Sequence, residues 1–182
     1  MIKTLVVVGH PNLSESIVNK AWTESLQALE DDNVKVHVLS DAIGPNGQFN
    51  IVAEQALLCN YNRIILQFPL YWYMVPAIMK QWMDTVWCEG FCYGDGGIHL
   101  EGKWIEIATS CGAPEFCFNP EKGGVAIAEY TSFLQGSAAF VRGKAGRVFA
   151  FYGAGGPDCM ERLKENVLAY KAFVLSDPTE QV

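Results

Sequence analysis

The stretch FPLYWYMVPAIMKQWMDTVW, from Phe68 to Trp87, carries the chain from a buried strand through a stiff loop into a helix. The strand is RIILQF, from Arg63 to Phe68, an apolar run of strand length. Pro69 and Pro76 bracket the loop, and proline both fixes its own φ and disfavours a helical conformation in the residue before it. From Val75 the apolar residues return with helical spacing, so the stretch predicts one strand–loop–helix unit.

The same unit recurs on both sides of this stretch. We predict strands at residues 2–10, 34–40, 63–68, 104–110 and 146–152, and helices at residues 16–30, 51–60, 75–87, 125–140 and 158–174. Strands that alternate with helices are typical of a parallel sheet, and strands that are apolar throughout indicate that both faces are covered. We therefore expect a single domain, residues 1–182, of the α/β class: a doubly wound, five-stranded parallel sheet with helices on both faces.

Composition excludes several classes of function. The net charge of −7 repels phosphate backbones, so we expect no nucleic-acid partner. No apolar run approaches the roughly 18 residues of a membrane-spanning helix, and the N-terminal MIKTLVVVGHP turns polar too soon for a signal peptide. The six cysteines form no CxxC pair and lack a nearby pair of histidines. We therefore expect no metal site, and we expect reduced thiols in a cytoplasmic protein.

Function is expected in the loops that follow the strands, because open parallel sheets bind ligands beyond the carboxyl ends of their strands. These loops read GHPNLSES, PLYWYM, TSCGAPEF and YGAGGPD. The first loop opens a helix, whose N-terminal N–H groups and partial positive charge suit a phosphate. Ser14, Ser16 and Asn19 add polar groups there, although a serine in this place also serves to cap the helix. GxGxxG and GxxxxGK[ST] are both absent, so the sequence supports neither a Rossmann fingerprint nor a P-loop.

The two middle loops offer an aromatic wall and a cysteine. Tyr71, Trp72 and Tyr73 form a stiff aromatic surface that suits either a flat ring system or burial in a core or a dimer interface. Cys111 lies at a strand-to-helix turn, where a nucleophile can sit in some α/β enzymes. A thiol enzyme would also need a base, and of the three histidines His37 lies within a strand and is predicted to be structural.

Three motifs give the chain a family resemblance. They are GHP followed by S-x-x-N (Ser16–Asn19), the long block AEQALLxxxNRIILQFPLYWYMVPAIMKQWMDTVW, and GFCYGDGGIHLEGK (Gly90–Lys103). With them, nearly the whole chain resembles the short NAD(P)H:quinone oxidoreductases of the flavodoxin-like fold. This group includes the modulator-of-drug-activity-type proteins and the ancillary flavoprotein of the glutathione-gated potassium-efflux system.

The resemblance implies a flavoprotein that uses FMN, and the short C-terminal part makes FAD the less favoured cofactor. NAD(P)H would reduce the flavin and then leave the pocket to a quinone, which is a ping-pong mechanism; no side chain is assigned as catalytic. The resemblance also implies a homodimer with its site at the subunit interface. The implied cofactor-binding residues are His10, Ser16, Ile17, Val18 and Asn19 for the phosphate and ribityl chain, Pro69, Leu70, Tyr71 and Trp72 for the ring, and Thr109, Ser110, Cys111 and Gly112, through backbone amides, for its polar edge.

The chain departs from the family pattern at two places. The family usually has T-T-G-G where this chain reads TSCG from Thr109 to Gly112, and the cysteine side chain would crowd the flavin edge or adjust its potential. The family often has a tyrosine soon after, whereas Phe116 and Phe118 carry no hydroxyl, so we expect weaker or differently specific turnover. Two alternatives stay open: a redox-sensing ancillary flavoprotein that docks on a membrane potassium-efflux transporter, and a Cys111-dependent thiol enzyme.

Overall fold

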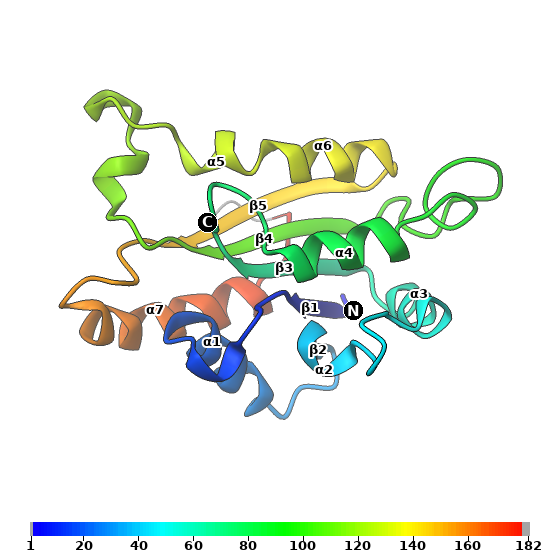
Figure 1. The fold of residues 1–182 in the computed structure, drawn as a ribbon, viewed down its shortest axis with the longest axis horizontal. Helices are drawn as coiled ribbons and strands as arrows, with labels where there is room; N and C mark the ends of the chain where they lie inside the picture. The colour runs from blue at the N-terminus through cyan, green and yellow to red at the C-terminus, as the bar shows by residue number, and fades with distance from the viewer. Residues whose placement is uncertain (1, 180–182) are drawn as a thin grey trace.

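A computed structural model describes residues 2–179, and its five strands form one parallel sheet in the order β2-β1-β3-β4-β5 (Figure 1). The strands are β1 (Thr4–Val8), β2 (Val34–Val38), β3 (Arg63–Pro69), β4 (Trp104–Ser110) and β5 (Lys144–Phe151). Every neighbouring pair is parallel, which confirms the predicted α/β fold. The strand order reverses between β1 and β3, and ligands of such sheets bind at this switch point.

Helices separate the strands along the chain. They are α1 (Val18–Gln27), α2 (Leu39–Ala42), α3 (Ile51–Cys59), α4 (Ala77–Val86), α5 (Ile127–Tyr130), α6 (Ser132–Phe140) and α7 (Cys159–Leu175). Short 3-10 turns lie at Leu13–Glu15, Glu115–Phe118 and Pro120–Lys122. Two predictions are wrong in detail: Leu39 and Ser40 belong to α2 and not to the strand, and the helix predicted at 125–140 is two helices that meet at Thr131. The buried Thr131 hydroxyl bonds back to the Ile127 carbonyl at 2.9 Å, a contact that bends helices.

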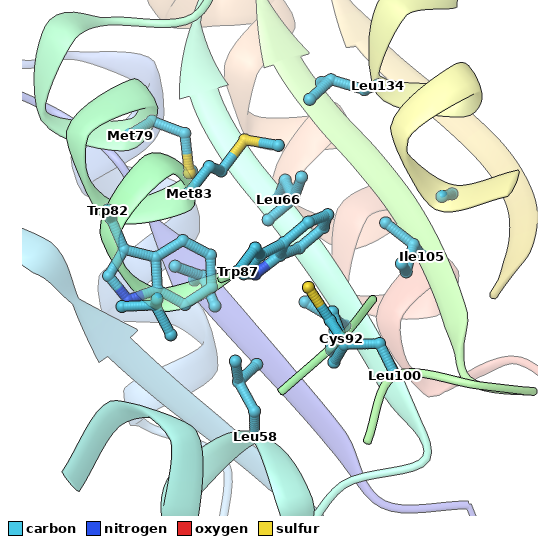
Figure 2. Close-up of a cluster of buried hydrophobic side chains, with 14 of the residues drawn as sticks. Leu58, Leu66, Met79, Trp82, Met83, Trp87, Cys92, Leu100, Ile105 and Leu134 are labelled. Atoms are coloured by element: carbon cyan, nitrogen blue, oxygen red, sulfur yellow. The ribbon is translucent and has the colours of Figure 1, made fainter. Parts of the chain in front are cut away.

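The core has two parts, one on each face of the sheet. Along β1, Leu5 and Val7 join the cluster of α3, α4 and α6, whereas Val6 and Val8 join the cluster of α1 and α7. This alternation is the period of two expected for a strand that is covered on both faces. Figure 2 shows the first cluster, in which side chains from helices and strands surround the indole of Trp87.

The two ends of the sheet carry different irregular segments. The segment between β4 and α5 extends outward from the carboxyl ends of the strands (Figure 1). The segment at residues 87–103 precedes β4 and lies at the opposite, amino-terminal end, near α3 (Figure 1). Within residues 2–179, no helix is both long enough and apolar enough to cross a bilayer.

Candidate functional site

The loop after β1 brings the start of α1 to the carboxyl edge of the sheet. Ser16 Oγ accepts a hydrogen bond from the Asn19 backbone N–H at 3.2 Å, so this serine does cap the helix. The other N–H groups of the first turn have no acceptor within the helix, and they carry the partial positive charge of its N-terminal end. His10 is buried, and its Nδ1 accepts from the Asn12 N–H at 3.1 Å. Burial lowers the pKa of His10 below its ordinary value, which keeps the ring neutral at pH 7.

The loop after β3 is a tight turn with two strained aromatic residues at its tip. Tyr71 and Met74 exchange two backbone hydrogen bonds, each 3.0 Å long. Between them, Trp72 and Tyr73 have φ values of 49° and 62°, in the left-handed region that bulky side chains rarely adopt. Trp72 is 91% exposed, whereas Tyr73 stacks on Tyr130 with the ring centroids 4.4 Å apart. Backbone strain clusters at functional sites, so the turn points to a function at this edge.

The loop after β4 supplies polar groups. Ser110 Oγ accepts a hydrogen bond from Asn19 Nδ2 at 2.9 Å, which joins this loop to α1. Thr109 Oγ1 is buried and has no hydrogen-bond partner among residues 2–179. A buried hydroxyl in this state is costly unless a ligand or a water satisfies it. Gly112 has open space where a side chain would project, so a ligand can approach its backbone.

Cys111 is closed off from this edge. The residue is 1% exposed, its N–H donates to the Phe151 carbonyl at 2.7 Å, and its carbonyl accepts from the Ala154 N–H at 2.9 Å. Burial raises the pKa of the Cys111 thiol to about 12, which opposes its use as a nucleophile. The Cys111 amide, which was expected to bind the ligand, is already paired in this structure, which leaves it no free proton for a ligand. His37, predicted to be structural, contacts buried Glu54 at 2.8 Å.

A buried polar network lies beneath these loops. Gln67 of β3 donates through Nε2 to the Asn19 carbonyl and to the Thr23 hydroxyl, both at 3.1 Å. Gln67 Oε1 accepts from the Tyr170 hydroxyl of α7 at 2.8 Å. Asn19 reaches Ser110 in turn, so side chains from α1, β3, β4 and α7 fix one another in place. The sequence reasoning missed this network, because its members lie far apart in the chain and no local pattern marks them.

The four strand-end loops line one cavity of about 410 Å³. It brings together these residues that the resemblance implied: His10, Ser16, Ile17, Val18, Asn19, Pro69, Leu70, Tyr71, Ser110 and Gly112. Three more of the implied residues do not line it: Trp72, Thr109 and Cys111. The sequence reasoning missed the lining residues Pro11, Asn12, Glu15, Ala154 and Gly155. The last two belong to the YGAGGPD loop, and its place after β5 was the available signal.

A larger cavity of about 930 Å³ adjoins the first at Gly112 and Gly155. Its charged lining residues are Glu115, Asp158, Arg162 and Glu165. Arg162 is already paired with Asp158 at 2.9 Å, so the lining is acidic on balance and disfavours a phosphate. The smaller cavity has a single carboxylate, Glu15, and receives the positive end of α1. A ligand with a phosphate and a flat ring therefore fits the smaller cavity better.

A parallel sheet with this strand order, and a cavity built from its strand-end loops at the switch point, defines a flavodoxin-like α/β protein with a candidate site for a small molecule. A family model described as the flavodoxin-like fold matches residues 2–174. The chain belongs to this family.

Two curated relatives carry functional names. The protein named "Uncharacterized NAD(P)H oxidoreductase YrkL", from Bacillus subtilis (strain 168), is 40% identical over 155 residues, which are 84% of this chain and 86% of that protein. The glutathione-regulated potassium-efflux system ancillary protein KefG from Cronobacter sakazakii is 39% identical over 119 residues, which are 65% of this chain and 63% of that protein.

Two solved structures are similar over nearly their whole length. General stress protein 14 from Treponema denticola, in complex with FMN, has a TM-score of 0.87 and 30% identity, with 94% of this chain and 97% of that chain covered. An NADPH-quinone reductase from P. pentosaceus has a TM-score of 0.82 and 31% identity, with 97% and 99% covered.

Proposed function

We propose that this protein is an FMN-dependent NAD(P)H oxidoreductase that passes two electrons from NAD(P)H to quinones or similar acceptors by a ping-pong mechanism. The observation that carries this proposal is the single cavity lined by the loops after β1, β3, β4 and β5. It combines a helix N-terminus, an aromatic turn and polar strand-end groups, which a phosphorylated ring cofactor requires. The FMN complex of the Treponema denticola relative supports the cofactor, and the names of YrkL and the P. pentosaceus enzyme support the reaction.

The binding roles follow from the position of each group along the cavity. The start of α1 would hold the phosphate and ribityl chain with His10, Ser16, Ile17, Val18 and Asn19. The turn after β3 would line the ring with Pro69, Leu70 and Tyr71, and Trp72, which lies outside the cavity lining, would approach the ring from the tip of the turn. The loop after β4 would meet the polar edge of the ring with Thr109, Ser110 and Gly112.

FMN, when bound, supplies the redox chemistry, because it accepts a hydride from NAD(P)H and returns two electrons to the acceptor. The protein contributes position and hydrogen bonds. Ser110 Oγ already accepts from Asn19, which leaves the Ser110 proton free to donate toward a ring carbonyl. Thr109 offers a second hydroxyl, one that lacks any other described partner. Because His10 Nδ1 accepts a hydrogen bond, the proton of the neutral ring lies on Nε2, where it can be donated to a phosphate oxygen.

We propose further that the aromatic turn is covered in a homodimer. Tyr71, Trp72, Tyr73 and Met74 are 46%, 91%, 52% and 45% exposed, and apolar surface gathered on one turn is typical of an interface. Sedimentation velocity should show a dimer for the wild type and a monomer for Trp72→Asp. A wild-type monomer at micromolar concentration would contradict the dimer. The six cysteines are free, and we propose the cytoplasm as the compartment that would keep them reduced.

The first test is the visible absorbance spectrum of the purified protein with FMN, before and after NADPH is added under nitrogen. We expect bound flavin that bleaches on reduction. Ile17→Glu should weaken FMN binding about ten-fold, because a like charge close to the phosphate costs about 1.4 kcal/mol. Val52→Glu is the matched control. Val52, like Ile17, is an exposed β-branched residue close to a helix N-terminus, here that of α3, but it does not line the cavity.

The outcomes separate the site from the function. Equal FMN affinity in Ile17→Glu and Val52→Glu would contradict the position of the phosphate. A wild-type protein that binds no FMN and oxidises neither NADH nor NADPH would refute the proposed function. FAD, tested in the same way, should bind more weakly, since the adjoining cavity is acidic.

The KefG relative favours a second candidate function, an ancillary flavoprotein that regulates a potassium-efflux transporter. The same flavin site would then sense redox state while the protein is docked on the transporter. Co-purification of the tagged protein with a potassium-efflux transporter from detergent-solubilised membranes would support this role. A tagged protein that leaves the transporter behind, yet reduces quinones, would exclude it.

A further inference from the structure

A second chemical site lies at the other end of the sheet from the cavity. Cys59 is the last residue of α3 and is exposed, and its Sγ is 3.8 Å from Nδ1 of His99. His99 belongs to the 87–103 segment, which lies at the amino-terminal end of the sheet (Figure 1). Neither residue lines the cavity at the strand ends, so this contact is independent of the proposed flavin site.

The His99 ring is held in place beside the sulfur. It stacks on Phe91 with the centroids 5.0 Å apart and an interplanar angle of 16°. The His99 backbone N–H also donates to the Phe91 carbonyl at 3.0 Å. With the ring fixed on one face and Nδ1 turned to Sγ, the histidine is placed to take the proton of the thiol, as a base does beside a catalytic cysteine.

A lysine is held near the end of α3, the helix that carries Cys59. Lys103 Nζ donates to the Tyr61 carbonyl, which anchors the amine just beyond the end of α3. The ammonium group therefore lies at the same end of α3 as Cys59.

We propose that Cys59, with His99 as its base, is a modification site that reacts with low-molecular-weight disulfides. His99 Nδ1 takes the thiol proton, and Cys59 Sγ attacks one sulfur of R–S–S–R. The S–S bond of the reagent breaks and a Cys59–S–S–R bond forms. The leaving R–S⁻ takes the proton from His99, so one thiol is oxidised to a mixed disulfide while half of the reagent is reduced to a thiol.

The chain contains its own control for this reaction. Cys117 is also exposed, but its sulfur makes no hydrogen bond within the described part of the chain. Cys92, Cys111 and Cys159 are buried, so they react only when the fold opens. Comparing the labelling of Cys59 with that of Cys117 therefore distinguishes activation of Cys59 from simple exposure. Labelling of the buried cysteines reports unfolding.

The test treats the reduced full-length protein with less than one equivalent of 2,2′-dithiodipyridine, an uncharged disulfide, and maps the modified peptides by mass spectrometry. Cys59 should react about ten-fold faster than Cys117, as expected for a thiol with a base held beside it. His99→Gln should remove most of this advantage and leave Cys117 unchanged. Cys59→Ser should remove the fast reaction altogether.

Equal rates at Cys59 and Cys117 would overturn the proposal. So would a Cys59 to Cys117 ratio that is the same in the wild type and in His99→Gln. If His99→Gln labels its buried cysteines, it has not folded, and the wild-type ratio then decides the proposal by itself.

Discussion

Replacing Trp72 by asparagine should stabilise the protein while it weakens its function. Trp72 has a φ of 49° and is 91% exposed, so its removal costs little packing. The left-handed conformation costs most residues about 1–2 kcal/mol, and asparagine tolerates it better than tryptophan. Recovery of about half of this cost would raise the free energy of unfolding by about 0.5–1 kcal/mol. Tyr73 is the poorer choice, since its stack on Tyr130 contributes about 0.5–1.5 kcal/mol that would be lost.

Urea denaturation, followed by circular dichroism, measures this change. It should be repeated over a range of protein concentrations, because a dimer adds stability that depends on concentration. Phe116→Asn is the control: Phe116 is 58% exposed but does not have a positive φ. At the lowest concentration Trp72→Asn should gain stability, and Phe116→Asn should gain none. FMN binding and turnover should fall only in Trp72→Asn.

A Trp72→Asn variant that is no more stable than the wild type at any concentration would refute the account of strain at the turn. A Trp72→Asn variant that is more stable and keeps full turnover would show that the strained conformation is not needed for function. The expected combination, a gain in stability with a loss of activity, is the trade-off found where an active site holds an unfavourable conformation.

Three further changes test other parts of the structure, all by urea denaturation. Glu106→Gln should lower the free energy of unfolding by about 3 kcal/mol. Glu106 is fully buried against two arginines, and the loss of its charge leaves the Arg63 charge unpaired. Glu101→Gln is the control: Glu101 is exposed, so its loss should cost under about 1 kcal/mol. Tyr170→Phe should cost about 1–3 kcal/mol, since a buried amide oxygen loses its donor, and it should also weaken FMN binding. Burial lowers the pKa of His10 below its unfolded value of 6.5, so the unfolded state binds more protons; stability should fall as the pH drops below 6.5, and His10→Asn should reduce this fall.

Each of these changes has an outcome that contradicts its reasoning. If Glu106→Gln and Glu101→Gln lower the free energy of unfolding by similar amounts, burial does not determine how much an ion pair contributes to stability. A Tyr170→Phe protein with wild-type FMN affinity would show that the buried polar network does not contribute to FMN binding. An unchanged pH dependence in His10→Asn would place the titrating group elsewhere.

Much of the fold could be predicted because its signals are local. The apolar runs around β1 and β3, and the helical spacing after Pro76, identified the elements to within a few residues. The errors in the predicted elements fall where a local pattern does not show at which residue an element begins or ends. Leu39 extends the apolar run of β2, so nothing in the run itself shows that α2 begins there. The break at Thr131 depends on a hydrogen bond that its hydroxyl makes only once the helix has formed.

The candidate site was predictable only in part. Residues that follow strands were found because a parallel sheet gathers its strand ends at one edge. The Tyr170–Gln67 hydrogen bond and the closed position of Cys111 depend on contacts between distant parts of the chain. The left-handed φ of Trp72 was also missed, since glycine or asparagine is the usual sign of such a turn.

On the ribosome, Gln67 emerges 103 residues before its phenol partner, Tyr170. Until α7 has left the exit tunnel and docked, the Gln67 amide oxygen beneath the cavity lacks its donor. Ala154 and Gly155, which complete the wall, also come late in synthesis. A nascent chain thus has its strand-end loops long before it has a binding site. Under the proposed function, flavin capture would therefore wait until α7 has been synthesised and has docked, and chains that stall before α7 would bind no flavin.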